Sequence, residues 1–396
     1  MSAGLSVRGG PWQPVVQLAE RVHAVRCCTS PLAKTLVAIV TDHSVAVYAT
    51  HTDDTRLRLA PVASFFVGSA ATALAFSPGA QYGNEDGVEK IELVIAAGDE
   101  LRLLSHSAHG TSSTVLGTTS ARINDMAWCA TPGYEQYVAC AAQDGAVQLW
   151  DLEPTQGTPA CHTLRLGASI QTVAFHAKVP KLLLAVDASG VGRLIDWLAS
   201  MSNGAHEAQT TMAFADPSAV ALHAAQGVCT AGRAAWQAQD PDVIGALLGT
   251  HWSVWNVGAR SAHPTRPLSS GTLAASALPG PGGFAFSPTN SRLFAVYAPA
   301  LSPALVAQSG AGSASHGTVH IYDAAFPQNP RRIEIQSQTP QTPAAVDLAT
   351  TGTGGGVSTL PSAYSVAGLD WLPQRVGAYD VLLVAIGTRI VPIPAA

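Results

Sequence analysis

The chain has 396 residues, of which 47% are hydrophobic and 12% are charged, and its formal net charge is -5. This composition excludes a disordered chain, which is rich in charge and poor in aliphatic residues, and six cysteines in this length are too few for a disulfide scaffold. Because 21 Lys and Arg stand against 26 Asp and Glu, no basic surplus is present for a phosphate backbone. We therefore expect no direct nucleic-acid partner.

The sequence also argues for an intracellular protein. Residues 1–10 lack the apolar core of a secretory signal, and no window approaches the 18 apolar residues of a membrane span. The cysteines show no CxxC spacing, and we expect them to be reduced core residues. They are Cys27, Cys28, Cys129, Cys140, Cys161 and Cys229. We expect a cytosolic or nuclear compartment and no membrane insertion.

Short alternating apolar runs, punctuated every ten or so residues by Gly, Pro, Asp or Asn, predict an all-β chain. A small residue followed by an aromatic residue recurs at the end of one strand in each repeat, and Cys27 takes the aromatic place in the first copy. The anchors are Cys27, Phe76, Trp128, Phe175, Trp236, Phe286 and Trp371, with separations of 49, 52, 47, 61, 50 and 85 residues. A period near 40 to 50 residues is typical of four-stranded propeller blades. The sequence thus predicts one seven-bladed WD40-type β-propeller domain over residues 1–396.

The ends of the chain predict how the ring closes. The last copy supplies only three strands, at 365–371, 379–386 and 389–393. The segment Trp12–Leu18 alternates Val15 with Gln13 and Gln17, as a strand does. We expect this segment, at about residues 12–19, to close the ring as the outer strand of the seventh blade, which removes an open edge.

One repeat carries a complete WD motif. Strand 138–142 runs into the turn Gln143-Asp144-Gly145, and strand 146–151 ends in Leu149-Trp150-Asp151. The offset from Asp144 to Trp150 is that of a WD40 repeat, in which the Asp holds neighbouring strands and the Trp packs between blades. We therefore assign Asp144, Trp150 and Asp151 a structural role.

Three further features interrupt the repeats. A helix is predicted over 219–225, in the long link before the fifth blade. The segments at about 298–316 and 337–362 are rich in Ala, Ser, Gly, Thr and Pro, and we expect them to be insertions in the sixth and seventh blades.

A search for catalytic or metal-binding groups yields no candidate. No G-x-S-x-G, Walker A or G-x-G-x-x-G motif is present. The spacing His106-x-x-His109 is the nearest to a metal motif, but a zinc site needs three or four ligands and no third lies nearby in sequence. We expect no catalytic residues, no cofactor and no metal, and a protein that is not an enzyme.

Trp252 and Trp255 depart from the periodic aromatic anchors. They occupy one strand, His251-Trp252-Ser253-Val254-Trp255-Asn256, and face opposite sides of it. We expect one of them to be core and the other exposed. Because interfaces are enriched in Trp, Trp252 is a candidate protein-interface residue.

The order of these motifs along the chain points to one family. The segments that carry the pattern are Val22-His23-Ala24-Val25, Leu74-Ala75-Phe76-Ser77-Pro78, Ile123-Asn124-Asp125 with the motif 143–152, Val173-Ala174-Phe175-His176 and Trp252-Ser253-Val254-Trp255. Together they resemble the nucleoporin thirty-seven family, the small WD-repeat nucleoporins of the Y-shaped outer-ring complex of the nuclear pore. The two insertions depart from the compact animal members.

The resemblance implies a scaffold subunit at the nuclear envelope that docks on the large propeller-plus-solenoid nucleoporin of the Y-complex short arm, among the other Y-complex nucleoporins. It implies support of pore assembly and hence of nucleocytoplasmic and mRNA transport. It marks no interface residues. Two alternatives remain: a WD40 adaptor of another assembly, such as a ubiquitin-ligase substrate receptor or a vesicle-coat subunit, and a propeller hydrolase with polar groups at its channel.

Overall fold

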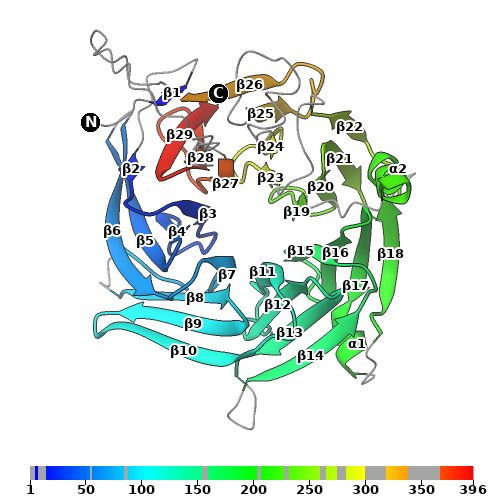
Figure 1. Cartoon of the computed structure of the whole chain (residues 1–396), viewed down its shortest axis with the longest axis horizontal. Helices are drawn as coiled ribbons and strands as arrows, with labels where there is room; N and C mark the ends of the chain where they lie inside the picture. The colour runs from blue at the N-terminus through cyan, green and yellow to red at the C-terminus, as the bar shows by residue number, and fades with distance from the viewer. Residues whose placement is uncertain are drawn as a thin grey trace, which may run out of the picture.

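Seven antiparallel sheets follow one another along the chain and surround a central axis, like the blades of a propeller (Figure 1). The computed structural model describes residues 5–7, 15–53, 56–83, 88–153, 159–202, 207–226, 232–258, 265–273, 282–298, 318–337 and 366–395. The predicted all-β, seven-bladed architecture is confirmed.

We letter the strands of each blade a to d from the axis outward. Blade 1 consists of β3 (Val22–Cys27), β4 (Leu36–Thr41), β5 (Ser44–Asp53) and β6 (Arg56–Phe66), and blade 2 of β7 (Ala71–Phe76), β8 (Lys90–Ala97), β9 (Glu100–Ser107) and β10 (Gly110–Thr118). Blade 3 consists of β11 (Ile123–Trp128), β12 (Tyr137–Ala142), β13 (Ala146–Asp151) and β14 (Ala160–Arg165), and blade 4 of β15 (Ile170–Phe175), β16 (Leu182–Asp187), β17 (Val191–Asp196) and β18 (Thr210–Ala215).

The remaining blades follow the same order. Blade 5 consists of β19 (Gly232–Trp236), β20 (Val243–Leu248), β21 (His251–Asn256) and β22 (Ser269–Thr272), and blade 6 of β23 (Gly283–Phe286), β24 (Leu293–Ala298), β25 (Thr318–Asp323) and β26 (Arg331–Ser337). Blade 7 consists of β27 (Val366–Trp371), β28 (Asp380–Ile386), β29 (Arg389–Ala395) and β2 (Val16–Gln17). Every predicted anchor residue ends strand a of its blade.

Each blade buries both faces of its sheet against its neighbours. Strands β4 and β28 are buried at every position, which explains why they are aliphatic runs and not alternating ones. The apolar clusters lie between adjacent blades: one joins blades 1 and 2, for example, and another joins blades 6 and 7. A single blade has no core of its own, so its stability depends on both neighbours.

Antiparallel strands place the connections on two faces of the ring. Connections a–b and c–d emerge on one face, which we call the bottom face, and connections b–c and d–a on the other, the top face. The strands that flank the expected insertions at 298–316 and 337–362 are β24, β25, β26 and β27, so both insertions leave and rejoin the blades at the top face. Residues 299–317 and 338–365 lie outside the described residues.

The N-terminal segment closes the ring as predicted. Val16 pairs with Ile390 and Gln17 with Arg389 of β29, and the amide of Leu18 donates to the carbonyl of Thr388 at 2.8 Å. Residues 12–14 of the predicted strand lie outside the described residues. The sequence did not predict a further strand, β1 (Leu5–Val7), which adds a fifth strand to blade 6 by pairing with β26.

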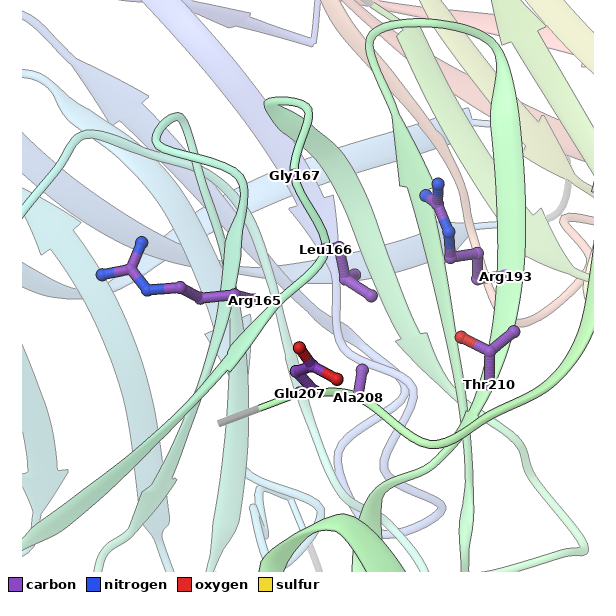
Figure 2. Close-up of a pocket in the computed structure, with 7 residues that line it drawn as sticks. All are labelled: Arg165, Leu166, Gly167, Arg193, Glu207, Ala208 and Thr210. Carbon is purple, nitrogen blue, oxygen red and sulfur yellow. The ribbon is translucent and has the colours of Figure 1, made fainter. Parts of the chain in front are cut away.

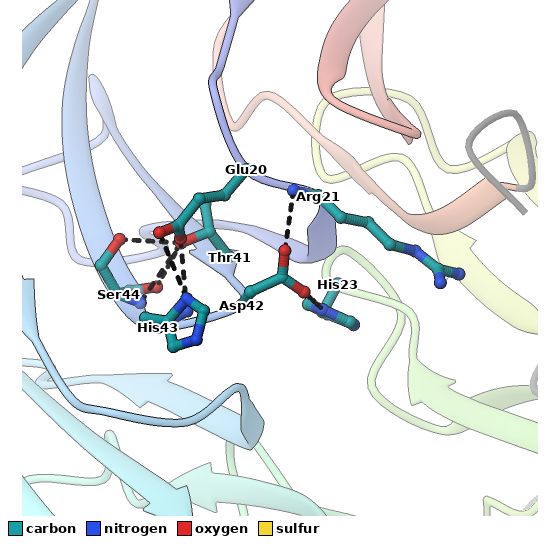
Figure 3. A network of polar contacts seen from close by, with 7 residues as sticks. All are labelled: Glu20, Arg21, His23, Thr41, Asp42, His43 and Ser44. Atoms are coloured by element: carbon teal, nitrogen blue, oxygen red, sulfur yellow. Dashed lines mark hydrogen bonds and ion pairs between the residues drawn. The ribbon is translucent and has the colours of Figure 1, made fainter. Parts of the chain in front are cut away.

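A network of polar contacts holds the closing segment where it passes into blade 1 (Figure 3). The Glu20 carboxylate accepts hydrogen bonds from the Thr41 hydroxyl at 2.5 Å and from the His43 amide at 3.2 Å. The Asp42 carboxylate accepts from the Arg21 amide at 3.1 Å and lies 2.7 Å from Nε2 of His23. These contacts tie the d–a connection between blades 7 and 1 to the b–c turn of blade 1.

This network predicts that the closure of the ring contributes less stability at low pH. The hydrogen bond with His23 lowers the pKa of Asp42, and the hydrogen bond from Thr41 lowers the pKa of Glu20. A carboxyl whose pKa is lower in the folded state contributes stability above its ordinary pKa and loses it as the pH falls through the folded value.

We therefore expect Asp42→Asn to lower the free energy of unfolding by less than about 1 kcal/mol at neutral pH, because the pair is partly solvated. The wild-type advantage should be complete above about pH 5 and should decline as the pH falls through the ordinary Asp pKa to the lowered pKa of folded Asp42, that is, to below about pH 3. Urea titrations of both proteins across this range measure the difference, and a difference independent of pH would contradict the prediction.

Two helices lie in the connections of blade 4. The predicted helix is confirmed as α2 (Pro217–Gln226), with the Asp216 carboxylate accepting from the amides of Ser218 and Ala219 at 2.9 Å, as an N-cap does. Helix α1 (Trp197–Ser202) was not predicted. No helix in the described part of the chain is long and apolar enough to cross a membrane.

Candidate functional site

The WD motif of blade 3 has the geometry that the sequence predicts. Asp144 lies in the turn between β12 and β13, where its carboxylate accepts from the Ala146 amide at 3.2 Å and reaches the Ser120 hydroxyl in the d–a connection at 3.5 Å. Gly145 has a φ of +85°, and a Cβ there would lie 2.4 Å from the carbonyl oxygen of Gly167. Asp144 therefore links the turn to the neighbouring connection.

Trp150 forms the wedge between blades 2 and 3. The side chain is 5% exposed and packs in the cluster that contains Val94 and Leu101 of blade 2. Its ring lies over Gly117 of β10, where an added Cβ would be 2.6 Å from the indole. Asp151 ends the strand and accepts from the Glu153 amide at 3.1 Å. These contacts hold the turn, the neighbouring connection and the two blades together.

The structure corrects the expectation for Trp252 and Trp255. They do face opposite sides of β21, but Trp252 is 2% exposed and Trp255 is 1% exposed. Trp252 packs on Phe294 and Tyr322 of blade 6, and Trp255 packs on Phe214 of blade 4. Because a neighbouring blade covers each face of the sheet, neither ring reaches the surface, and Trp252 is not an interface residue.

Four charged side chains, from blades 1, 3, 5 and 7, meet near the central axis, all on strands a. Asp125 of blade 3 lies 3.8 Å from Arg26 of blade 1 and 3.5 Å from Arg233 of blade 5. Asp370 of blade 7 accepts from the Cys27 amide at 2.9 Å and interacts with the Arg26 charge. The sequence analysis did not find this cluster, which links four of the seven blades.

The axial carboxylates are stabilised by partners and are not arranged as an acid and base pair. Burial raises the pKa of Asp125 and of Asp370, and the Arg26 charge opposes this rise in both. Asp125 also accepts from the Thr172 hydroxyl at 2.6 Å. Since each carboxylate already has an arginine and hydrogen-bond donors, the cluster serves to hold strands a together.

We expect Arg26→Ala to lower the free energy of unfolding by about 1–3 kcal/mol, less than for a fully buried pair because Arg26 is 19% exposed. Without the guanidinium, burial raises the pKa of both carboxyls further, because hydrogen bonds then oppose it without the Arg26 charge. A raised folded pKa favours the folded state at low pH and loses this effect as the pH rises. The loss should therefore be larger at about pH 8 than at about pH 4.

Chemical denaturation at the two pH values tests this. Asp125→Asn in the Arg26→Ala background should restore part of the stability, because it removes a buried charge that has lost one of its two arginine partners. An equal loss at both pH values, or no rescue, would show that Arg26 does not act through these carboxylates.

The described residues contain no group of three or more His, Cys, Asp or Glu side chains that could hold a metal ion. His106 lies 3.9 Å from Glu89 and is partly buried, whereas His109 is exposed in the β9–β10 turn. The expectation that all cysteines are core residues holds for Cys27, Cys28, Cys129 and Cys140. It is wrong for Cys161, which is exposed on the outer strand β14, and Cys229 lies outside the described residues.

A pocket of about 460 Å³ lies at the outer strands of blades 3 and 4 (Figure 2). Its lining includes Arg165, Arg193 and Glu207. Arg193 is already paired with Asp187 at 2.5 Å, and Figure 2 shows the Arg165 side chain directed away from Glu207. The remaining lining residues are Leu166, Gly167, Ala208 and Thr210.

The exposed apolar side chains concentrate on the bottom face. Eight large hydrophobic residues of the described part are exposed, and five of them lie in a–b or c–d connections: Leu32, Val88, Leu268, Phe326 and Tyr379. The other three are Phe66, Val115 and Val220. These five side chains come from five different blades, and Phe326 and Tyr379 lie on the neighbouring blades 6 and 7.

The structure of the chain is similar to the β-propeller domain of Cps50 (Swd1) from Myceliophteria thermophila, with a TM-score of 0.60 and 12% sequence identity. The similarity covers 98% of this chain and 100% of that domain. The chain is a seven-bladed, WD40-type β-propeller. No family model matches the sequence, and no curated protein matches it.

Proposed function

We propose that this propeller is a non-enzymatic scaffold protein of the nuclear pore, which docks on the large short-arm nucleoporin of the Y complex. The observation that carries the scaffold function is the concentration of five exposed apolar side chains on the bottom face. The charged groups at the axis and the WD motif are engaged in structural contacts. The faces of the ring are what such a molecule offers to partners.

The assignment to the nuclear pore rests on the order of motifs along the sequence. The start of β3 at Val22-His23-Ala24-Val25, the repeat with the complete WD motif and the Trp252-Ser253-Val254-Trp255 strand occur in the order found in the nucleoporin thirty-seven family. The similarity to the Cps50 (Swd1) propeller concerns the fold, since the identity is 12%. A WD40 adaptor of another assembly is the alternative.

Affinity purification of the tagged chain from nuclear-envelope extract, with identification of the co-purifying proteins by mass spectrometry, tests the proposal. We expect stoichiometric recovery of Y-complex nucleoporins. Recovery of ubiquitin-ligase or vesicle-coat subunits without nucleoporins would overturn the nuclear-pore assignment. A tagged WD40 propeller from an unrelated complex is the control for nonspecific recovery.

A further inference from the structure

The bottom face of blades 6 and 7 combines exposed aromatic rings with arginines. Phe326, in the c–d connection of blade 6, is 64% exposed, and Tyr379, in the a–b connection of blade 7, is 41% exposed. The Arg292 guanidinium lies 5.9 Å from the centre of the Phe326 ring. Aromatic residues and arginine are the types most enriched among the side chains that dominate binding energy at protein interfaces.

The connections that carry these side chains are fixed to one another. The Arg331 guanidinium of blade 6 donates to the Pro394 carbonyl of blade 7 at 2.6 Å, and the Thr289 hydroxyl of blade 6 donates to the Asp380 carboxylate of blade 7. Arg292 is held against Asp323 by two hydrogen bonds, at 3.1 and 2.7 Å. A surface that is ordered before binding loses less entropy when a partner docks.

The charge of this surface differs in sign from that of the chain. The connections at 287–293, 323–332 and 372–380 contain four arginines and two aspartates, which gives 4 − 2 = +2, whereas the whole chain carries -5. The Arg292 side chain is 55% exposed and that of its partner Asp323 is 34% exposed. The Arg375 side chain is 51% exposed and that of its partner Asp380 is 3% exposed. The positive groups therefore face solvent more than the negative ones.

We infer that the bottom face of blades 6 and 7 is the docking surface for the partner protein, and that it binds an acidic segment that also carries apolar side chains. The segment's carboxylates face Arg292, Arg331 and Arg375, and its apolar side chains contact Phe326 and Tyr379. Complementary charge orients the partner and speeds association, while the aromatic rings supply most of the affinity. This inference rests on the proposed function for the identity of the partner.

The test uses purified full-length chain and the purified short-arm nucleoporin of the same organism, with affinity measured by isothermal titration calorimetry. We expect Phe326→Ala to weaken binding by about tenfold or more, as for an interface hot spot, and Tyr379→Ala to weaken it in the same direction. The double variant Arg292→Gln, Arg375→Gln should bind more weakly and lose part of the salt dependence of the wild-type affinity.

Matched controls lie elsewhere on the ring. Phe66→Ala removes a ring that is 78% exposed at the end of β6, and Arg165→Gln removes an exposed charge at blade 3. Both should bind as the wild type does. Circular dichroism melting of every variant checks that the ring is folded, and Tyr379→Ala provides a second aromatic variant if Phe326→Ala fails to fold.

The outcomes separate the two proposals. If the wild type binds and the Phe326, Tyr379 and arginine variants bind equally well, the docking surface is wrong and the scaffold function stands. If the Phe66 or Arg165 control weakens binding instead, the partner docks elsewhere on the ring. If the wild type does not bind the nucleoporin at all, the proposed function and this surface fall together.

Discussion

Deleting residues 1–19 is expected to convert the protein into an aggregating species. The deletion removes β2, which pairs with Ile390 and Arg389, and so leaves the last strand of blade 7 with unpaired backbone donors and acceptors. It also removes Val15, Val16 and Leu18, which pack on the apolar cluster that joins blades 7 and 1. An open hydrophobic edge pairs readily with other chains. Size-exclusion chromatography with light scattering should show large oligomers at micromolar concentration.

A shorter deletion is the matched control, because it distinguishes ring closure from the extra strand on blade 6. Removing residues 1–10 eliminates β1, which pairs with β26, but keeps β2. We expect this protein to stay monomeric with a nearly unchanged melting temperature. A monomeric 1–19 deletion with unchanged melting would show that the ring does not depend on its N-terminal strand.

Trp150→Ala should lower the free energy of unfolding by about 3–5 kcal/mol, the cost typical of removing a large buried aromatic side chain. The indole is 5% exposed and fills the space between blades 2 and 3, so its removal leaves a cavity lined by two blades that cannot collapse without moving the ring. Urea unfolding monitored by far-ultraviolet circular dichroism measures the loss.

Two further variants identify the cause of that loss. Trp128→Ala, in the same blade but partly exposed, should cost less. Gly117→Ala, which forces a methyl group against the Trp150 ring, should destabilise by about 1–3 kcal/mol through overpacking. A Trp150→Ala protein as stable as the wild type would refute the assignment of Trp150 as an interblade wedge.

The propeller could be predicted because each blade contains a short sequence pattern that can be recognised without knowing the tertiary structure. The aromatic anchors end strand a of every blade, and the two-residue strand Val16–Gln17 lies inside a longer segment whose alternation is visible. Strand β1 could not be predicted, because three residues are too few to show the alternation of a strand. Its partner strand β26 also lies more than 300 residues further along the chain. Helix α1 is too short to show a helical period.

The site residues were harder to predict than the fold. Alternation correctly placed Trp252 and Trp255 on opposite faces of β21, but it cannot show that both faces of the sheet are covered. Cys161 was expected in the core because free cysteines are usually buried, yet its strand is the outer one of its blade. Position in the blade decides exposure, and it is a property of the assembled ring.

The axial cluster had a signal in the sequence. Arg26 and Asp370 stand one residue before the anchors Cys27 and Trp371, and Asp125 and Arg233 stand three residues before Trp128 and Trp236. Charged residues at these places interrupt strands that are otherwise small and apolar. The sequence does not show which strands surround the axis. It therefore could not show which of these positive and negative side chains lie close together.

The pairing of Val16 with Ile390 also constrains how the protein is made in the cell. The closing strand leaves the ribosome well before its partner strand, because Val16 and Ile390 are separated by 390 − 16 = 374 positions in the sequence. Throughout synthesis the growing chain therefore has an incomplete ring, with one blade face and one sheet edge uncovered. Such intermediates aggregate readily, so the yield of folded protein should depend on chaperones that shield the nascent blades until β29 has emerged and paired with β2.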